Sequence, residues 1–172
     1  MGDVRRAYGY APSRGKVYVQ RPPEGWQEGD KDKCGLLRVS LYGTRDAAQN
    51  WEEEVGRALK EFGLSQGRST PCAYRHDKKN LPVAVHGDDI FFTGTRANVE
   101  WLMGRIKSRY EIRGQVIGEA KGLAKELNIF NRSARWTAHG IEIEAEPRHA
   151  KEVIQALGLE GSNPVATPTE AG

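Results

Sequence analysis

The sequence predicts an α+β fold, in which helices cover one face of an antiparallel sheet. Apolar residues recur at three- and four-residue steps over 44–62 and again over 97–110, which is the period of a helix. Short runs rich in β-branched and aromatic residues lie before, between and after these two segments. The resulting order of strand, helix, strand-turn-strand, helix and strand is the split βαβ plan.

The N-terminal part begins with strand-like segments. DVRRAY (3–8) looks like the start of a strand, and KVYVQRPP (16–23) looks like a short strand that two prolines stop. The stretch 24–33 is Gly-rich and charged, so we expect a loop there. Helix 44–62 follows, and Gly63 can end it. Both crossovers of a split βαβ plan lie on one side of the sheet, so we expect both helices to pack on the same face. The side chains expected in that core are Trp51, Val55, Leu59, Leu102 and Ile106.

The central part predicts a hairpin. Strands are expected at 72–75 and 81–85 around a polar turn, and a further strand at 90–93 leads toward the second helix. After this helix, 110–118 and 123–144 look like extended segments linked by turns. Pro147 suits the first turn of a third helix over 146–159.

Length and composition limit the class of protein. A chain of 172 residues suits one domain with a real core. We expect a core at 1–113, strands and a helix at 114–160, and a linker at 161–172, in a chain that looks like a piece of something longer. Two cysteines suggest no disulfide framework, and neither a membrane-length apolar run nor a signal peptide is found. We therefore expect a soluble, intracellular protein without a membrane partner; the oligomeric state stays open.

The charge balance argues against a strongly basic protein that binds nucleic acid by charge alone. The sequence has 26 Lys and Arg against 23 Asp and Glu, a net charge of only +3, so any basic surface must be local. Four basic residues gather around the end of the second helix. They could face a nucleic-acid backbone, or they could be a solvated helix end that complements the helix dipole. These residues are Arg105, Lys107, Arg109 and Arg113.

Two adjacent aspartates, Asp88 and Asp89, stand between the apolar runs VAV and IFF. Adjacent acidic residues are common in polar turns. Here the flanks predict a buried hairpin, in which desolvation and mutual repulsion are costly unless a cation offsets them. Mg²⁺ prefers carboxylate and phosphate oxygens, and Asp3 could supply a third carboxylate because the first and third strands of this plan are neighbours. Cys72 and His76 have half of a zinc spacing, but no second half follows.

Six sequence blocks, in order, resemble the copia-type retrotransposon reverse transcriptases. Each block alone is weak, but together they cover nearly the whole chain in register. The blocks are DVRRAY (3–8), VYVQ with PPEG (17–25), SLYG with Trp51 (40–51), TPCAY (70–74), HGDD (86–89) and PVATP (164–168).

The resemblance implies a polymerase palm of the split βαβ, ferredoxin-like type, which extends a primer on a nucleic-acid template with deoxynucleoside triphosphates. Asp3 and Asp88 would hold a pair of Mg²⁺ (or Mn²⁺) ions, with Asp89 beside them. Tyr8 falls on the aromatic position that tells deoxyribose from ribose by bulk, unless it is an ordinary strand aromatic. Gln49 could contact nucleotide or template, although a solvated surface residue is the commoner case.

The sequence also departs from the family pattern. His86 and Gly87 precede the aspartates where the family has an aromatic and a small apolar residue; Gly loosens a strand, His adds a titratable group, and we interpret both as drift. Imidazole is a poor Mg²⁺ ligand. The fingers segment and the ribonuclease H of the family lie outside the 172 residues, so we expect the chain by itself to be inactive or very weak. The alternative function is a catalytically inactive palm remnant that binds nucleic acid or protein.

Overall fold

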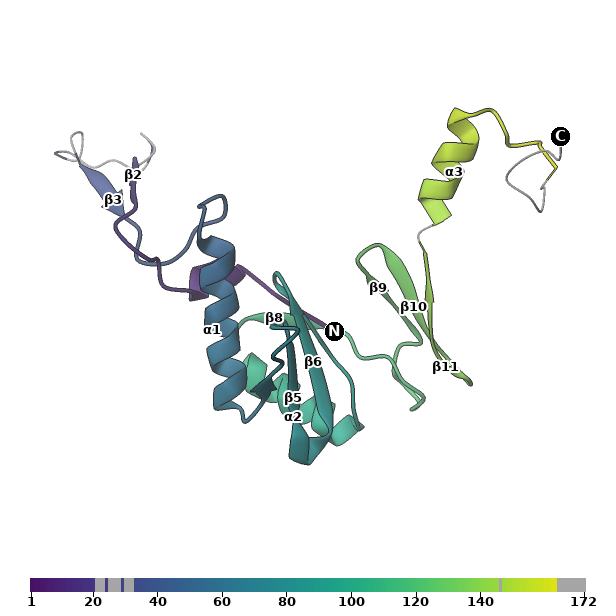
Figure 1. Ribbon diagram of the computed structural model, residues 1–172, viewed down its shortest axis with the longest axis horizontal. Helices are drawn as coiled ribbons and strands as arrows, with labels where there is room; N and C mark the ends of the chain where they lie inside the picture. The colour runs from purple at the N-terminus through teal and green to yellow at the C-terminus, as the bar shows by residue number, and fades with distance from the viewer. Residues whose placement is uncertain (21–23, 25–28, 30–32, 146, 164–172) are drawn as a thin grey trace. The chain divides into compact units, whose positions relative to one another are not determined.

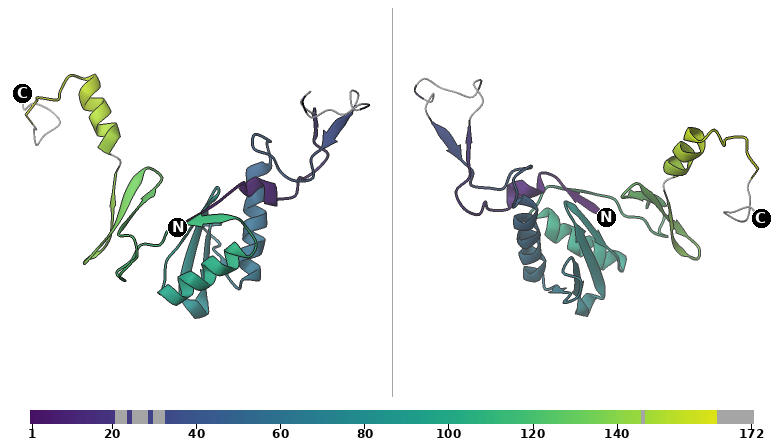
Figure 2. Two further views of the ribbon diagram at one scale, coloured as in Figure 1. Left: turned by 180° about the vertical axis from the view of Figure 1, so that it is seen from behind. Right: turned by 45° about the horizontal axis from the view of Figure 1, so that its top comes forward.

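The computed structural model describes residues 1–20, 24, 29, 33–145 and 147–163. The chain divides into two compact units, Met1–Gly114 and Gln115–Gly172. Most of their elements are labelled in Figure 1, and Figure 2 gives two further views. The predicted strand at 16–23, the loop at 24–33 and the linker at 161–172 lie partly outside the described residues.

The first unit is built on a six-stranded antiparallel sheet with the order β4-β5-β6-β7-β1-β8. The predicted α+β class and antiparallel sheet are thereby confirmed. The strand β1, which comes first in the sequence, is an inner strand between β7 and β8. The strands are β1 (Gly2–Val4), β4 (Ser65–Gln66), β5 (Ala73–His76), β6 (Leu81–His86), β7 (Asp89–Phe92) and β8 (Ile112–Gly114).

The helices α1 (Ala47–Glu61) and α2 (Arg96–Lys107) share one core with the sheet. In β6 burial alternates strictly, so that every second side chain faces this core and the others face away. All five helix residues expected in the core are at most 1% exposed, which confirms the prediction. The core-facing residues of α1, α2 and β6 are Trp51, Val55, Leu59, Leu102, Ile106, Leu81, Val83 and Val85.

The predicted strand at 3–8 is wrong beyond Val4. Arg6 adopts the left-handed conformation with φ 55°, which ends the strand, and a 3-10 helix follows at Ala7–Tyr10. Tyr8 therefore lies on a 3-10 turn rather than in the sheet. The strands β2 (Tyr18–Gln20) and β3 (Cys34–Leu36) form a separate hairpin. The sequence predicted a strand at β2 but none at β3.

A buried carboxylate joins the middle of α1 to the segment that follows α2. Glu54 on α1 is 6% exposed and accepts hydrogen bonds from Arg109 at 2.9 Å and from the Tyr110 hydroxyl at 3.1 Å. Arg109 also forms an ion pair with Glu61, and Arg57 forms one with Glu54. Desolvation raises the pKa of Tyr110 to about 12, so its hydroxyl remains a proton donor to Glu54.

The second unit contains an antiparallel three-stranded sheet and a helix. The strands β9 (Glu126–Ile129), β10 (Arg132–Thr137) and β11 (Gly140–Glu144) form a meander, which confirms the extended segments expected at 123–144. The helix α3 (Pro147–Ala156) begins at the predicted proline. Among the described residues, no helix has both the length and the apolar character that a membrane crossing requires.

Candidate active site

The two aspartates lie at the tip of the β6–β7 hairpin. His86 pairs with Asp89, which leaves Gly87 and Asp88 as a two-residue turn. Gly87 has φ 57°, and such tight hairpin turns need a positive φ that glycine adopts without steric cost. The glycine before the aspartates therefore serves the turn, and the expectation that it loosens a strand is wrong because β6 ends at His86.

Strand β1 brings a third carboxylate to this tip. Asp3 is the direct cross-strand partner of Asp89 on one side and of Arg113 on the other, and the backbone N–H of Val4 donates to the Asp88 carbonyl at 2.9 Å. Directly opposed residues point to the same face of a sheet. A row of His86, Asp89, Asp3 and Arg113 therefore crosses four strands on the face opposite the two helices.

The carboxylates of this row repel one another. The pKa of Asp89 is raised by burial, then by the charges of Asp88 and Asp3, while His86 and the chain's amino group act in the opposite direction. Carboxylate oxygens are the ligands that hard divalent cations such as Mg²⁺ prefer. In the part of the chain that the structure describes, no three His, Cys, Asp or Glu side chains are arranged as a ready metal-binding group. The metal role of the three aspartates stays a prediction.

Two tyrosines stand beside the aspartates. The rings of Tyr8 and Tyr42 lie 4.3 Å apart, centroid to centroid. The pKa of Tyr42 is raised by desolvation and by the charges of Asp88, Tyr8 and Asp3, so both rings are neighbours of the carboxylates. Tyr42 was missed as a candidate, although it belongs to the SLYG block that carried part of the resemblance.

Trp51 was expected only in the core, but it also holds the hairpin tip. Its indole N–H donates to the Gly87 carbonyl at 2.6 Å, across 36 residues of sequence. The bond links α1 to the turn immediately before Asp88. Sequence periodicity could place the ring in the core but could not reveal this tertiary hydrogen bond.

The remaining candidate residues do not form one group. Gln49 is exposed on α1 and lines a cavity between this helix and β5. Arg109 is engaged by Glu54 and Glu61, and the Arg105 guanidinium lies over the Phe62 ring at 5.2 Å. Lys107 is exposed in the last turn of α2. Among these four basic residues, Arg113 is the one that lies directly opposite an aspartate, Asp3, on the neighbouring strand.

Comparison with known proteins gives the family. A family model described as "Reverse transcriptase (RNA-dependent DNA polymerase)" matches residues 1–171. The chain belongs to this reverse transcriptase family. Two yeast relatives, from Saccharomyces cerevisiae, are the Transposon Ty1-BL and Ty1-DR5 Gag-Pol polyproteins, 26% and 27% identical over 161 residues. These matches cover 93% of this chain and 8% of each polyprotein. The resemblance to copia-type retrotransposon reverse transcriptases is confirmed, and no solved structure matches.

The raised pKa of Asp89 predicts that this chain gains stability on the change Asp89→Asn. A carboxyl whose pKa is higher in the folded than in the unfolded chain destabilises the fold once it is ionised. This cost is present at pH values above the ordinary range of carboxyl pKa values. The variant should therefore have a higher urea midpoint than the parent at neutral pH. The gain should vanish in acid, where the Asp89 carboxyl is protonated in both the folded and the unfolded chain. If Asp89→Asn is less stable than the parent chain at neutral pH, the electrostatic cause is wrong.

The indole hydrogen bond predicts that Trp51→Phe loosens the turn at Gly87 and Asp88. The change removes the N–H donor, leaves the Gly87 carbonyl without it, and should cost about 1–3 kcal/mol of unfolding free energy. In heteronuclear NMR spectra, the amides of 86–90 should shift most and exchange faster with solvent. Shifts spread evenly over the core of α1 would instead indicate that only packing was lost.

Proposed function

We propose that the first unit is a polymerase palm of the split βαβ, ferredoxin-like type. The strand order β6-β7-β1-β8, with α1 between β1 and β6 and α2 between β7 and β8, supports this proposal. Both helices pack on one face, which leaves the aspartate face open for a nucleic-acid duplex. The activity is RNA-directed DNA polymerisation, in which a primer is extended on a template with deoxynucleoside triphosphates.

The observation that carries the proposal is the register of β1. Asp3 stands opposite Asp89, and Asp88 occupies the adjoining turn, in a chain of the reverse transcriptase family. Asp3 and Asp88 would bind Mg²⁺ or Mn²⁺, with Asp89 beside them. Bound divalent ions would lower the pKa of the primer 3′ hydroxyl and neutralise charge on the triphosphate. The three residues supply the charge and the oxygen donors, and the short turn restricts where Asp88 can move.

The neighbouring side chains suggest how substrates are bound. The neighbouring rings of Tyr8 and Tyr42, which are tilted by 47° to each other, offer an apolar wall beside the aspartates, against which a deoxyribose would pack and a 2′-hydroxyl would clash. Arg113 is placed to contact a phosphate oxygen close to Asp3. Arg105, Lys107 and Arg109 remain candidates for backbone contacts, and Gln49 remains a candidate for nucleotide contact.

Metal binding and primer extension test the proposal together. The chain is titrated with Mn²⁺, free Mn²⁺ is followed by electron paramagnetic resonance, and Mg²⁺ is added as competitor. A labelled DNA primer on an RNA template is then offered with Mn²⁺ and deoxynucleotides, to this chain and to longer forms of the protein. We expect Mn²⁺ binding that Mg²⁺ displaces. No specific binding in any form would favour the second candidate, a catalytically inactive palm remnant that binds nucleic acid or protein.

A further inference from the structure

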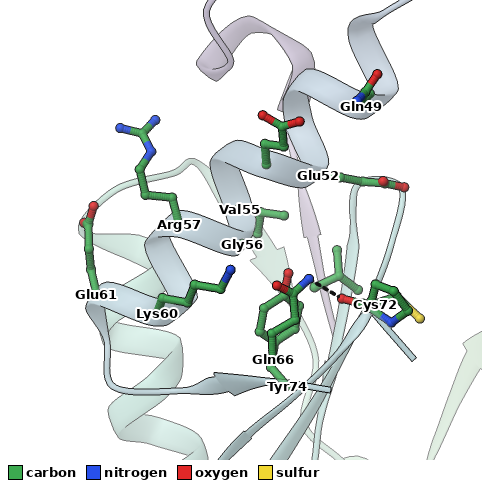
Figure 3. Close-up of a pocket in the computed structure, with 13 residues that line it drawn as sticks. Gln49, Glu52, Val55, Gly56, Arg57, Lys60, Glu61, Gln66, Cys72 and Tyr74 are labelled. Carbon is green, nitrogen blue, oxygen red and sulfur yellow. Dashed lines mark hydrogen bonds between the residues drawn. The ribbon is translucent and has the colours of Figure 1, made fainter. Parts of the chain in front are cut away.

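A groove of about 940 Å³ lies on the helix-covered side of the sheet. One wall is α1, the opposite wall is the stretch from Gln66 to Cys72, and Tyr74 and Val85 form the floor (Figure 3). Tyr74 pairs with Val83 in register, so it points toward the helices and away from the aspartate row. A molecule in this groove would leave the proposed catalytic face free.

The floor contains a hydroxyl group. The Tyr74 side chain is 6% exposed overall, and its hydroxyl lies so close to Gly56 that a Cβ there would come within 2.7 Å of it. No hydrogen bond joins this hydroxyl to another group in the described part of the chain. The hydroxyl is not one of the fully buried side-chain atoms that lack a partner, so it reaches the solvent of the groove, where a ligand can accept a hydrogen bond from it. The absence of a side chain at Gly56 makes room for the hydroxyl against α1.

Two charges on α1 flank this hydroxyl. The other charged residues of the wall have partners, because Glu53 pairs with Arg14, Arg57 with Glu54, and Glu61 with Arg109. Figure 3 shows Lys60 pointing from α1 toward Gln66 and Tyr74, while Arg57 and Glu61 point away. Within the described residues, Glu52 and Lys60 have no ion-pair partner. They are eight residues apart on one helix face, which places them about 12 Å apart along the axis.

We propose that this groove binds an extended peptide segment that carries a basic and an acidic side chain four residues apart. Four residues of extended chain span about 13 Å, which matches the spacing of Glu52 and Lys60. Between them, a backbone carbonyl of the peptide accepts the hydrogen bond of Tyr74. Few small metabolites carry opposite charges so far apart, and the Glu52 carboxylate repels a nucleic-acid backbone. The groove is therefore a site for a protein partner, and of the residues in the polymerase proposal only Gln49 lines it.

The test uses the full chain and blocked synthetic peptides of the sequence KAVAE, with KAVAQ and QAVAE as controls that each lack one charge. Heteronuclear NMR titration should shift the amides of Gly56, Gln66 and Tyr74 with KAVAE, and leave Asp88 and Asp89 unchanged. The control peptides should bind more weakly. No shifts at millimolar KAVAE, or equal shifts with all three peptides, would overturn the proposal.

Two variants test separately what the charges and the Tyr74 hydroxyl contribute to peptide binding. Glu52→Lys should weaken KAVAE binding about fivefold or more, and should strengthen binding of the peptide EAVAE by a similar factor, because both groove ends are then basic. A gain for EAVAE cannot result from misfolding. Tyr74→Phe should weaken both peptides about two- to tenfold. If Glu52→Lys affects both peptides equally, the charge-matched site is wrong.

Discussion

When Asp88 is replaced by asparagine, divalent-cation binding should be lost in this chain, and primer extension should fall about 100-fold or more in the longer forms of the protein in which we expect activity. Asparagine has nearly the same shape, and the Asp88 carbonyl that holds the Val4 amide belongs to the backbone, so the turn should persist. The change removes one negative charge from a group that we propose binds Mg²⁺ or Mn²⁺. Loss of a single group that stabilises charge in a transition state typically costs about 100- to 1,000-fold. Mn²⁺ titration and single-turnover extension measure the two effects.

Asp77→Asn is the matched control for Asp88→Asn. Asp77 follows β5, its side chain is 79% exposed, and its nearest cation is Arg75 at 3.6 Å. The same chemical change should leave both metal binding and extension unaltered there. Equal Mn²⁺ affinity in the parent chain and in Asp88→Asn would exclude Asp88 as a metal ligand, even if extension fell.

The second large effect is expected on stability, at Glu54. Glu54→Leu should lower the unfolding free energy by about 3–5 kcal/mol, because it leaves Arg109 partly buried beside an apolar side chain and removes the acceptor of the Tyr110 hydroxyl. Arg109 retains Glu61, so the lower end of this range is expected. Urea unfolding followed by tryptophan fluorescence, to which the fully buried Trp51 contributes, measures the change.

Glu61→Leu is the control for Glu54→Leu, since Glu61 pairs with the same arginine but its side chain is 53% exposed. Its removal should cost at most about 1 kcal/mol. The double change Glu54→Leu with Arg109→Leu should recover much of the lost stability, because an apolar pair of similar volume can replace a buried ion pair. Similar losses in the two glutamate variants would show that burial of Glu54 is not the cause.

Strong hydrophobic patterns made much of the fold predictable. The helical period over 44–62 located α1 to within three residues at its start, because burying Trp51, Val55 and Leu59 requires that period. Strands of two or three residues carry too few positions for a pattern, and β3 and β4 were therefore missed. The end of β1 depends on the left-handed backbone at Arg6, which is unusual for a side chain with a Cβ.

Part of the candidate site could also be predicted. Asp88 and Asp89 were found because charges stood between apolar runs, and Asp3 because the strand plan made it a neighbour. Contacts between distant segments could not be predicted. The hydrogen bond from Trp51 to Gly87 and the contact between the Tyr42 and Tyr8 rings depend on tertiary packing. The basic cluster looked continuous in sequence, yet the tertiary fold turns Arg109 toward α1 and Arg113 toward the aspartates.

The inner position of β1 affects the order in which the protein can assemble during synthesis. β1 leaves the ribosome first, yet its partners β7 and β8 follow more than 80 and 100 residues later. Asp3 can meet Asp89 only after the hairpin has emerged, and the sheet closes around β1 only after residue 114. Pairings between such distant segments form late, because closing a long loop costs entropy first. The row of His86, Asp89, Asp3 and Arg113 is thus one of the last parts of the unit to form, and the metal site that we propose there cannot assemble before β7 has paired with β1.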